Sequence, residues 1–520
     1  MNTKVILLVL DGWGLSPSFS GNAIKLANAE NFNYLWNSYP HWVLNVKPKD
    51  KKNDCIIDSN IGSATLSCGR FLPSNLEFIN NKIEDKTFYS NKALSDSMNK
   101  CLSHKSSLHL IGLISDSKKY SSLDHLFALM IMAKNKGLNE VYVHAICDGI
   151  DLEGKSAEVY INKIKEFINK ENVGKIASII GRNYCFDEEA SFENIVKSFK
   201  AITTGEASRS LDAIQTIYEN RKENRSDGRI YPTVIYENKH PIACIKDFDS
   251  IIFFNYDEKS LRSLSSIFLG QRHAIRDKEV YNVNVTTFTD YFYLTENDQF
   301  NIAFTRDDFK PNLAQVLSKN NKKQSYISDI EKSGSGIYSF CGQKDLLPGQ
   351  TNKTINIELN QKISSDYIFN ELIRSINNKN DDFICVNMSS ADYCAHRGNI
   401  KDIENAVRNI DSHLLKIEET ALENYYNLII TADHGFIEQL ANRNENNMTV
   451  KNHSNNPVPL IYVSKGNEKK SYNLGINNNL LSEILNSKNT VCDVAPTILD
   501  IFGIAKLDSM IGNPLIGGSK

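Results

Sequence analysis

The chain has 520 residues, of which 41% are hydrophobic and 23% are charged, and its formal net charge at neutral pH is −3. This length exceeds what one hydrophobic core usually organises, so we expect two domains or one large domain with an insertion. The near-neutral charge excludes a general nucleic-acid binder, which would carry a strongly basic face.

The sequence shows no targeting or membrane signal. The first apolar run, residues 5–10, ends at Asp11 and is shorter than the ~7–15 apolar residues of a secretory signal. No stretch approaches the ~20 apolar residues of a membrane-spanning helix. The ten cysteines form no CxxC pair, which is typical of reduced thiols. We therefore expect a soluble cytoplasmic protein with neither a membrane nor a nucleic-acid partner.

Strands alternate with helices along the chain. Residues 4–14 (KVILLVLDGWG) predict a buried strand and a turn, because Asp-Gly stops a short apolar run. Residues 22–36 follow with apolar side chains at helical spacing. Comparable apolar strand segments recur at 108–116, 140–149, 175–182, 250–257, 382–390 and 426–435. This alternation indicates βαβ units and a mainly parallel sheet. Polar stretches near residues 73–75 and 310 are the candidate domain boundaries.

Side chains suited to metal binding follow several of these strands. Asp11 follows the first strand, and Asp433 and His434 follow NLIITA. Asp392 and His396 come shortly after FICVNM, and their four-residue separation places them on one helix face. Ligands of open α/β sheets gather at the carboxyl ends of strands. The sequence therefore predicts that these side chains meet at one edge of a sheet.

His453, in the polar loop KNHSNNPVP, completes a set of three carboxylates and three imidazoles. Each member alone is weak evidence, because a lone Asp at a strand end is more often a helix N-cap and a lone loop His is more often solvated. Together they suit Mn²⁺ or Zn²⁺. Three imidazoles suit the harder Mg²⁺ poorly, so we favour Mn²⁺, with Zn²⁺ as the alternative.

A series of motifs resembles one known family. LDGWG, GNA, SNIGSATLSCGR, DYCAHRGN, TADHG, NHSNNPVP and DVAPTILDIFG occur in the order seen in cofactor-independent phosphoglycerate mutases of the alkaline-phosphatase superfamily. The resemblance runs from Val5 to about Ile504. It implies a two-domain α/β fold in which residues 1–73 and 310–520 form a phosphatase-like parallel-sheet domain. Residues 77–303 would form an inserted substrate-binding α/β domain, joined by linkers near 74–76 and 304–309. It also implies a monomer with its active site between the domains.

The resemblance also implies the roles of the motif residues. Ser59 would be the nucleophile that forms a phosphoserine and passes the phosphoryl group on. One divalent ion would be held by Asp392, His396 and His453. The other would be held by Asp11, Ser59, Asp433 and His434. Two cations about 3.5–4 Å apart would lower the pKa of the Ser59 hydroxyl, which is otherwise a poor nucleophile.

The matching substrate pocket departs from the family's pattern. Asp151 is kept as candidate general acid–base, and Arg182 and Lys332 are kept as anchors. A family histidine and four family arginines are replaced, in that order, by Tyr120, Ile150, Glu188, Asp257 and Ser260. Each lost charge-assisted contact costs roughly 1.5–3 kcal/mol. We therefore expect a small phosphorylated or phosphonate metabolite, altered from phosphoglycerate and less anionic away from its phosphoryl group. Substitute cations from Lys155, Lys259 or Arg262 are the alternative.

Three functions are consistent with these residues. The first is a phosphomutase, in which the phosphoryl group returns to the same molecule. The second is a phosphohydrolase or a phosphotransferase to another acceptor, which release of inorganic phosphate would mark. The third is a non-catalytic homologue that binds metal and ligand without turnover. The complete ligand set argues against the third, because such buried charge is costly to keep without metal.

Overall fold

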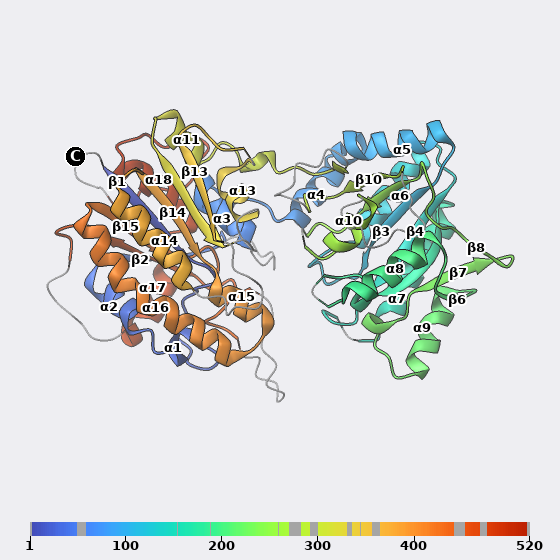
Figure 1. The fold of residues 1–520 in the computed structure, drawn as a ribbon, viewed down its shortest axis with the longest axis horizontal. Coiled ribbons are helices and arrows are strands. Elements are labelled where there is room, and N and C mark those ends of the chain that lie inside the picture. Colours follow the sequence, from blue (N-terminus) through green and yellow to red (C-terminus); the bar gives the residue numbers. More distant parts are fainter. Residues whose placement is uncertain are drawn as a thin grey trace. The chain divides into compact units, whose positions relative to one another are not determined.

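The computed structural model describes twelve segments of the chain: 3–48, 59–152, 154–187, 189–257, 259–269, 282–291, 300–329, 335–343, 345–355, 365–440, 453–468 and 476–516. The chain divides into two compact units, and each has an α/β fold with its own sheet (Figure 1). Unit 1 comprises Met1–Ser74 and Arg306–Lys520, and unit 2 comprises Asn75–Thr305. The sequence-based prediction placed the linkers near residues 74–76 and 304–309. Two predicted substrate contacts, Glu188 and Lys332, lie outside the described residues.

Unit 1 is built on a seven-stranded sheet in which the first five strands are parallel and the last two pair antiparallel. The order across the sheet is β13 (Gln350–Ile355), β12 (Gln324–Asp329), β14 (Phe383–Met388), β1 (Lys4–Leu10), β15 (Tyr426–Thr431), β16 (Val458–Val463) and β2 (His41–Leu44). The central strand β1 is buried from Val5 to Leu10. Continuous burial requires cover on both faces, which explains why VILLVL shows no polar alternation.

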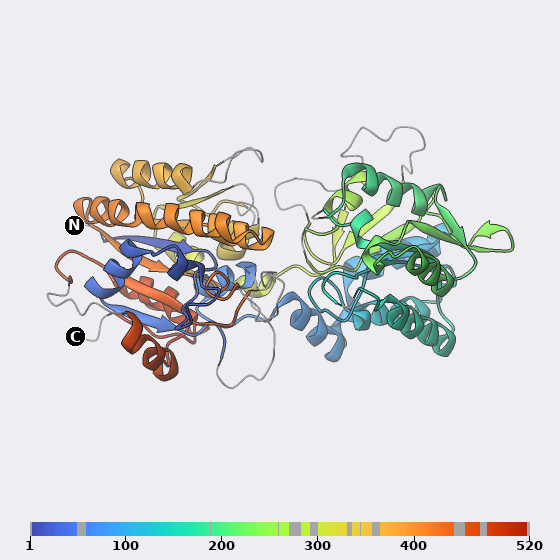
Figure 2. The ribbon, with the colours of Figure 1, turned by 90° about the horizontal axis from the view of Figure 1, so that it is seen from below.

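Helices cover both faces of this sheet (Figures 1 and 2). They are α1 (Ala23–Leu26), α2 (Glu30–Ser38), α3 (Ser59–Cys68), α11 (Leu313–Lys319), α13 (Ser335–Cys341), α14 (Ser365–Asn378), α15 (Ser390–Arg397), α16 (Ile400–Glu423), α17 (Ile476–Asn486) and α18 (Val494–Ile501). The long helix α16 is amphipathic and buries Val407, Ile410, Leu414 and Ile417 in the core of unit 1. This spacing is that of one helix face packed on a sheet.

Unit 2 has a nine-stranded sheet whose first six strands are parallel. Its order is β11 (Phe300–Ile302), β10 (Asn284–Thr287), β9 (Ser250–Phe253), β3 (Leu108–Ile114), β4 (Val141–Cys147), β5 (Lys175–Gly181), β7 (Thr233–Glu237) and β6 (Ser208–Ser210), with β8 (His240–Pro241) paired to β7. Alternate residues of β3 belong to two separate apolar clusters. Because successive side chains of a strand point to opposite faces, unit 2 has a core on each side of its sheet.

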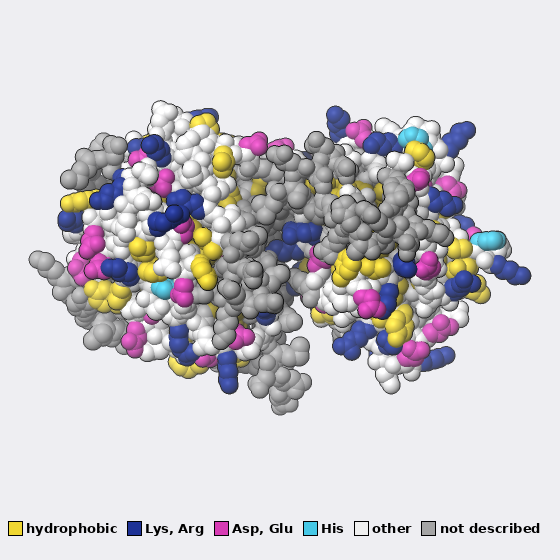
Figure 3. All heavy atoms as spheres, in the orientation of Figure 1, with side chains coloured by type: hydrophobic (Ala, Val, Ile, Leu, Met, Phe, Trp, Pro, Cys, Tyr) yellow, Lys and Arg dark blue, Asp and Glu magenta, His cyan; other side chains and the backbone are white. Residues whose placement is uncertain are grey.

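The helices of unit 2 are α4 (Asn75–Glu84), α5 (Lys92–His104), α6 (Leu123–Asn135), α7 (Ala157–Glu171), α8 (Phe192–Thr203), α9 (Ala213–Lys222) and α10 (Arg262–Phe268). Among the described residues, no helix combines the length and apolar character needed to cross a membrane. On the face shown in Figure 3, basic and acidic side chains are interspersed over the described surface. This mixture agrees with the small net charge of the chain.

Candidate metal centre

The three central strands of unit 1 bring the predicted metal ligands to one edge of the sheet. Strand β1 is parallel to β14 and β15, with Leu10 opposite Met388 and Val9 opposite Thr431. The three strands therefore end together, and the segments that follow them carry Asp11, Asp392 and Asp433. All three carboxylates are buried.

Helix α15 positions two of the predicted ligands. Asp392 and His396 lie one turn apart on it, with Nε2 of His396 3.7 Å from Oδ2 of Asp392. The helix ends at Gly398, whose φ of +81° is the left-handed conformation that glycine adopts most easily at a helix C-terminus. His396 is exposed and Asp392 is buried, so the pair extends from the surface of unit 1 into its interior.

The ligand atoms fall into two overlapping groups. One consists of Asp392, His396 and His453, and the other of Asp11, Asp392 and His434; within each group the ligand atoms lie within 4.8 Å of one another. Nε2 of His453 is 3.1 Å from Nε2 of His396. Asp392 belongs to both groups, although the sequence assigned it to only one. Asp433 joins the second group through its Oδ2, 3.8 Å from Nε2 of His434.

Ser59 lies beside the second group. It is the first residue of α3, and its Oγ is 2.8 Å from Nε2 of His434 and 3.4 Å from Oδ1 of Asp11. Gly62 of the same helix explains the close approach, because a Cβ there would lie 2.6 Å from the backbone oxygen of Asp433. The glycine in SNIGS thus lets α3 lie directly against the turn that carries two ligands.

The electrostatic field of the centre favours a cation. Burial by itself lowers the pKa of His434, but the carboxylates of Asp433, Asp11 and Asp392 outweigh it and raise this pKa to about 10. The ring of His434 stacks on that of His453, with centroids 3.9 Å apart. Three carboxylates and three imidazoles with convergent ligand atoms fit Mn²⁺ or Zn²⁺.

In unit 2, Arg182 occupies the corresponding edge of the sheet, directly after β5. Its side chain is 1% exposed and is ion-paired to three carboxylates. One Nη lies 3.0 Å from Oδ1 of Asp148 and also contacts Asp151, and the other lies 2.8 Å from Oε1 of Glu189. Burial opposes the charge of Arg182, yet Glu189, Tyr120 and Asp151 raise its pKa above the usual value for arginine.

Two aromatic rings complete the enclosure of Arg182. The guanidinium carbon is 4.9 Å from the ring centroid of Tyr120 and 4.6 Å from that of Phe186. Cation–π contacts of this kind are stronger when water is excluded. Tyr120, at the position where the sequence suggested a replaced histidine, thus contacts a protein cation.

Three positions at which the family resemblance implied replaced arginines, Ile150, Asp257 and Ser260, lie in loops of unit 2. Asp257 accepts the backbone N–H groups of Lys259 and Ser260, at 3.1 and 2.7 Å, and the Ser260 hydroxyl at 2.6 Å. Ser260 is buried as a result. Ile150 is 46% exposed, and its backbone N–H donates to Oδ1 of Asp148. In this arrangement Asp257 and Ser260 form a capped turn.

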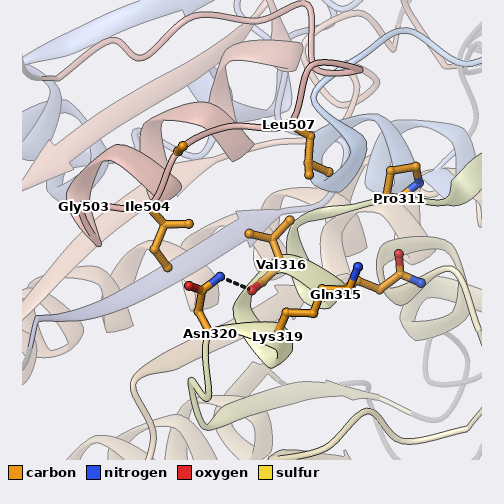
Figure 4. Close-up of a pocket in the computed structure, with 9 residues that line it drawn as sticks. Pro311, Gln315, Val316, Lys319, Asn320, Gly503, Ile504 and Leu507 are labelled. Carbon is orange, nitrogen blue, oxygen red and sulfur yellow. Dashed lines mark hydrogen bonds between the residues drawn. The ribbon is translucent and has the colours of Figure 1, made fainter.

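A groove of about 430 Å³ lies elsewhere in unit 1. It is lined by α11 and by the segment after α18, including Val316, Lys319, Ile504 and Leu507 (Figure 4). None of the predicted metal ligands lines it. It is therefore distinct from the metal centre.

Two family models match the chain, one over most of unit 2 and the other over much of unit 1. Residues 79–293 match the family model "BPG-independent PGAM N-terminus", and residues 298–472 match "Type I phosphodiesterase / nucleotide pyrophosphatase". The 2,3-bisphosphoglycerate-independent phosphoglycerate mutase of Clostridium tetani is 31% identical over 535 residues, covering 100% of both chains. The chain belongs to the cofactor-independent phosphoglycerate mutase family.

A second relative and one solved structure resemble the chain over nearly its full length. The enzyme of the same name from Francisella philomiragia is 30% identical over 538 residues and is covered in full. A crystal structure of Leishmania mexicana phosphoglycerate mutase at low cobalt concentration has a TM-score of 0.75 and 18% identity, covering 99% of this chain and 97% of the other. At that identity the likeness shows the fold alone.

Two further residues near the candidate metal centre were not predicted from the sequence. Asn387, within β14, donates from its Nδ2 to Oδ2 of Asp11 at 3.1 Å. Its signal was a polar residue inside the apolar run FICVNM. Glu438 is buried beside the loops that carry the ligands. Its only signal was an acidic residue five positions after Asp433.

Proposed function

We propose that this member of the mutase family is a metal-dependent phosphomutase that works through a phosphoserine on Ser59. The observation that supports this most is the position of the Ser59 hydroxyl, 2.8 Å from His434 and 3.4 Å from Asp11. A hydroxyl at the first turn of a helix, beside a cluster built for cations, is a nucleophile in a setting that activates it.

The proposed cofactor is a pair of divalent cations, with Mn²⁺ favoured and Zn²⁺ the alternative. One would be held by Asp392, His396 and His453, and the other by Asp11, Ser59, Asp433 and His434, with Asp392 close to both. Such ions, when bound, lower the pKa of a coordinated hydroxyl and neutralise phosphoryl oxygens.

The residues of the chain would carry the transfer in two steps. The deprotonated Oγ of Ser59 attacks phosphorus, the bond from phosphorus to the substrate oxygen breaks, and that oxygen takes up a proton. A second hydroxyl of the same molecule then loses a proton and attacks the phosphoserine, which regenerates Ser59. We assign the proton transfers to Asp151, which Arg182 contacts and whose backbone N–H donates to Asp148.

The proposed substrate is a small phosphorylated or phosphonate metabolite that is less anionic than phosphoglycerate away from its phosphoryl group. Support comes from the pocket, where Arg182 is already neutralised by three carboxylates and where Ile150, Asp257 and Ser260 offer no cation. A substrate carrying an amine suits such a pocket better than one carrying a carboxylate.

The test follows phosphorus by NMR after Mn²⁺-loaded protein is mixed with 3-phosphoglycerate. We expect little or no conversion to 2-phosphoglycerate and turnover of a different phosphorylated or phosphonate metabolite, which Ser59→Ala abolishes. Efficient conversion of 3-phosphoglycerate that depends on Ser59 would contradict the altered substrate. Turnover of metabolites by Ser59→Ala at the wild-type rate would contradict the phosphoserine.

A phosphohydrolase is the second candidate function. The replaced arginine positions support it, because a substrate held less firmly leaves the phosphoserine open to attack by water. Release of inorganic phosphate at the full rate of substrate consumption would favour this function. Release far below that rate would favour the mutase.

We further propose that the protein acts as a cytoplasmic monomer. The cysteines among the described residues are free thiols, as expected for a reducing compartment. Sedimentation of the purified protein tests the monomer, and fractionation of cells tests the compartment.

A further inference from the structure

Glu438 is a buried carboxylate that accepts four hydrogen bonds. Oε2 accepts the backbone N–H groups of Gly14 at 3.1 Å and Phe436 at 2.7 Å. Oε1 accepts Nδ2 of Asn456 at 2.9 Å and the hydroxyl of Ser454. Among the described residues, its hydrogen-bond donors are all neutral groups.

These four donors come from three loops that carry metal ligands. Gly14 lies three residues after Asp11, Phe436 two residues after His434, and Ser454 directly after His453. Other bonds join the same loops, since Ile437 N–H donates to Gly12 at 3.1 Å and Ser454 N–H to Gly435 at 2.7 Å. The Glu438 side chain accepts hydrogen bonds from all three loops.

Two glycines make room for this carboxylate. A Cβ on Gly14 would lie 2.3 Å from the carboxyl carbon of Glu438, and a Cβ on Gly435 would lie 2.7 Å from its Oε1. Both distances are too short for any other residue without movement. The loop motifs DGWG and ADHG are thus shaped to admit the Glu438 side chain.

We propose that Glu438 is a positioning residue that fixes the His453 loop against the Asp11 and His434 loops, and so sets the separation of the two halves of the metal centre. The inference rests on the proposed two-metal centre. Glu438 is no ligand itself; it acts through the loops that hold the ligands, as residues around metal sites commonly do.

The two carboxylate oxygens have different partners, which predicts a directional effect of Glu438→Gln. The backbone N–H groups of Gly14 and Phe436 can only donate, so the amide oxygen of the glutamine should face them. Its NH₂ group then faces Ser454 and Asn456, which must turn to accept. We therefore expect Glu438→Gln to displace chiefly the loop that carries His453.

The experiment titrates Mn²⁺ into the metal-free full-length protein and follows it by electron paramagnetic resonance. We expect two ions per wild-type chain with a spin-coupled signal. In Glu438→Gln we expect one ion to bind about 10–100-fold more weakly and the coupled signal to change, with the other ion less affected. Asn456→Ala, which removes one donor and keeps the carboxylate, should show the same pattern more mildly.

Asp411→Asn is the matched control. Asp411 is also a buried carboxylate of unit 1, and it accepts the backbone N–H groups of Asn31 and Phe32 at 3.1 and 2.8 Å, away from the ligand loops. It should lower stability without changing the coupled signal. Wild-type binding by both Glu438→Gln and Asn456→Ala would overturn the inference, as would an equal change in Asp411→Asn. Fewer than two ions in the wild type would contradict the metal centre itself.

Discussion

Both units place buried charged side chains at the carboxyl ends of their parallel strands, but the surroundings of these charges differ. In unit 1, buried carboxylates are grouped with imidazoles, and the field is strong enough to raise the pKa of His434 to about 10. In unit 2, Arg182 is surrounded by Asp148, Asp151 and Glu189. The first edge favours a cation from outside, whereas the second already contains its own. The difference supports the proposal that this family member keeps its metal centre but has an altered substrate pocket.

The largest effect is expected from Asp392→Asn, because this carboxylate belongs to both groups of ligand atoms. We expect Asp392→Asn to weaken the binding of both metal ions and to abolish phosphoryl transfer. His396→Gln should weaken chiefly the binding of one ion, since His396 belongs to one group. Calorimetric titration with Mn²⁺ distinguishes the two, and equal losses in both variants would contradict the shared role of Asp392.

Arg182→Leu tests whether the ion pairs of Arg182 stabilise the fold of unit 2. Removing the guanidinium leaves the buried Asp148 carboxylate without its ion-pair partner. We therefore expect a loss of about 3–5 kcal/mol in the free energy of unfolding. Urea denaturation measures this, and Mn²⁺ binding at unit 1 serves as the control that should not change. Unaltered stability together with a large rise in KM would instead assign Arg182 to the substrate.

Ile150→Arg restores one arginine that the family resemblance implies. Ile150 is 46% exposed, so the longer side chain should be tolerated by the fold. A single charge-assisted contact is worth roughly 1.5–3 kcal/mol, which corresponds to about a 10–100-fold gain in affinity for phosphoglycerate. Leu211→Arg, at a 74% exposed site of the same unit, is the control for non-specific charge. An equal gain in both variants would contradict a specific pocket.

The smallest expected effect is the dependence of metal-free stability on pH. The folded pKa of His434 is raised above its usual value of 6.5, so protonated His434 stabilises the fold fully below about 6.5. That contribution is lost as pH rises toward about 10. The melting temperature of the metal-free protein should fall over this range more in the wild type than in His434→Gln. Identical pH profiles would contradict the raised pKa.

Much of unit 1 could be predicted from the sequence because its signals are local. Apolar runs such as residues 5–10 fix the strands, and the position of Asp11 at a strand end follows from the same pattern. Parallel pairing then brings Asp392 and Asp433 to that edge. The sharing of Asp392 between two ligand groups was not predictable, because it depends on distances of a few ångströms.

The positioning role proposed for Glu438 depends on contacts between distant parts of the chain. Glu438 bonds to Gly14 across 424 positions, and no local pattern encodes that pairing. Asp257 had a local signal, since Asp followed three residues later by Ser is a common turn cap. Comparison with the family presented Asp257 as a lost arginine, and this concealed its role in the turn.

Trapping the phosphoenzyme tests both the proposed nucleophile and the proposed altered pocket. Mn²⁺-loaded protein is mixed with phosphorylated metabolites that differ in charge, quenched in acid, and mapped by peptide mass spectrometry. We predict a phosphoryl group on Ser59, formed faster from a metabolite that carries an amine than from 3-phosphoglycerate, and none in Ser59→Ala. Fastest labelling of Ser59 by 3-phosphoglycerate would contradict the altered pocket, and labelling of another residue would contradict the proposed centre.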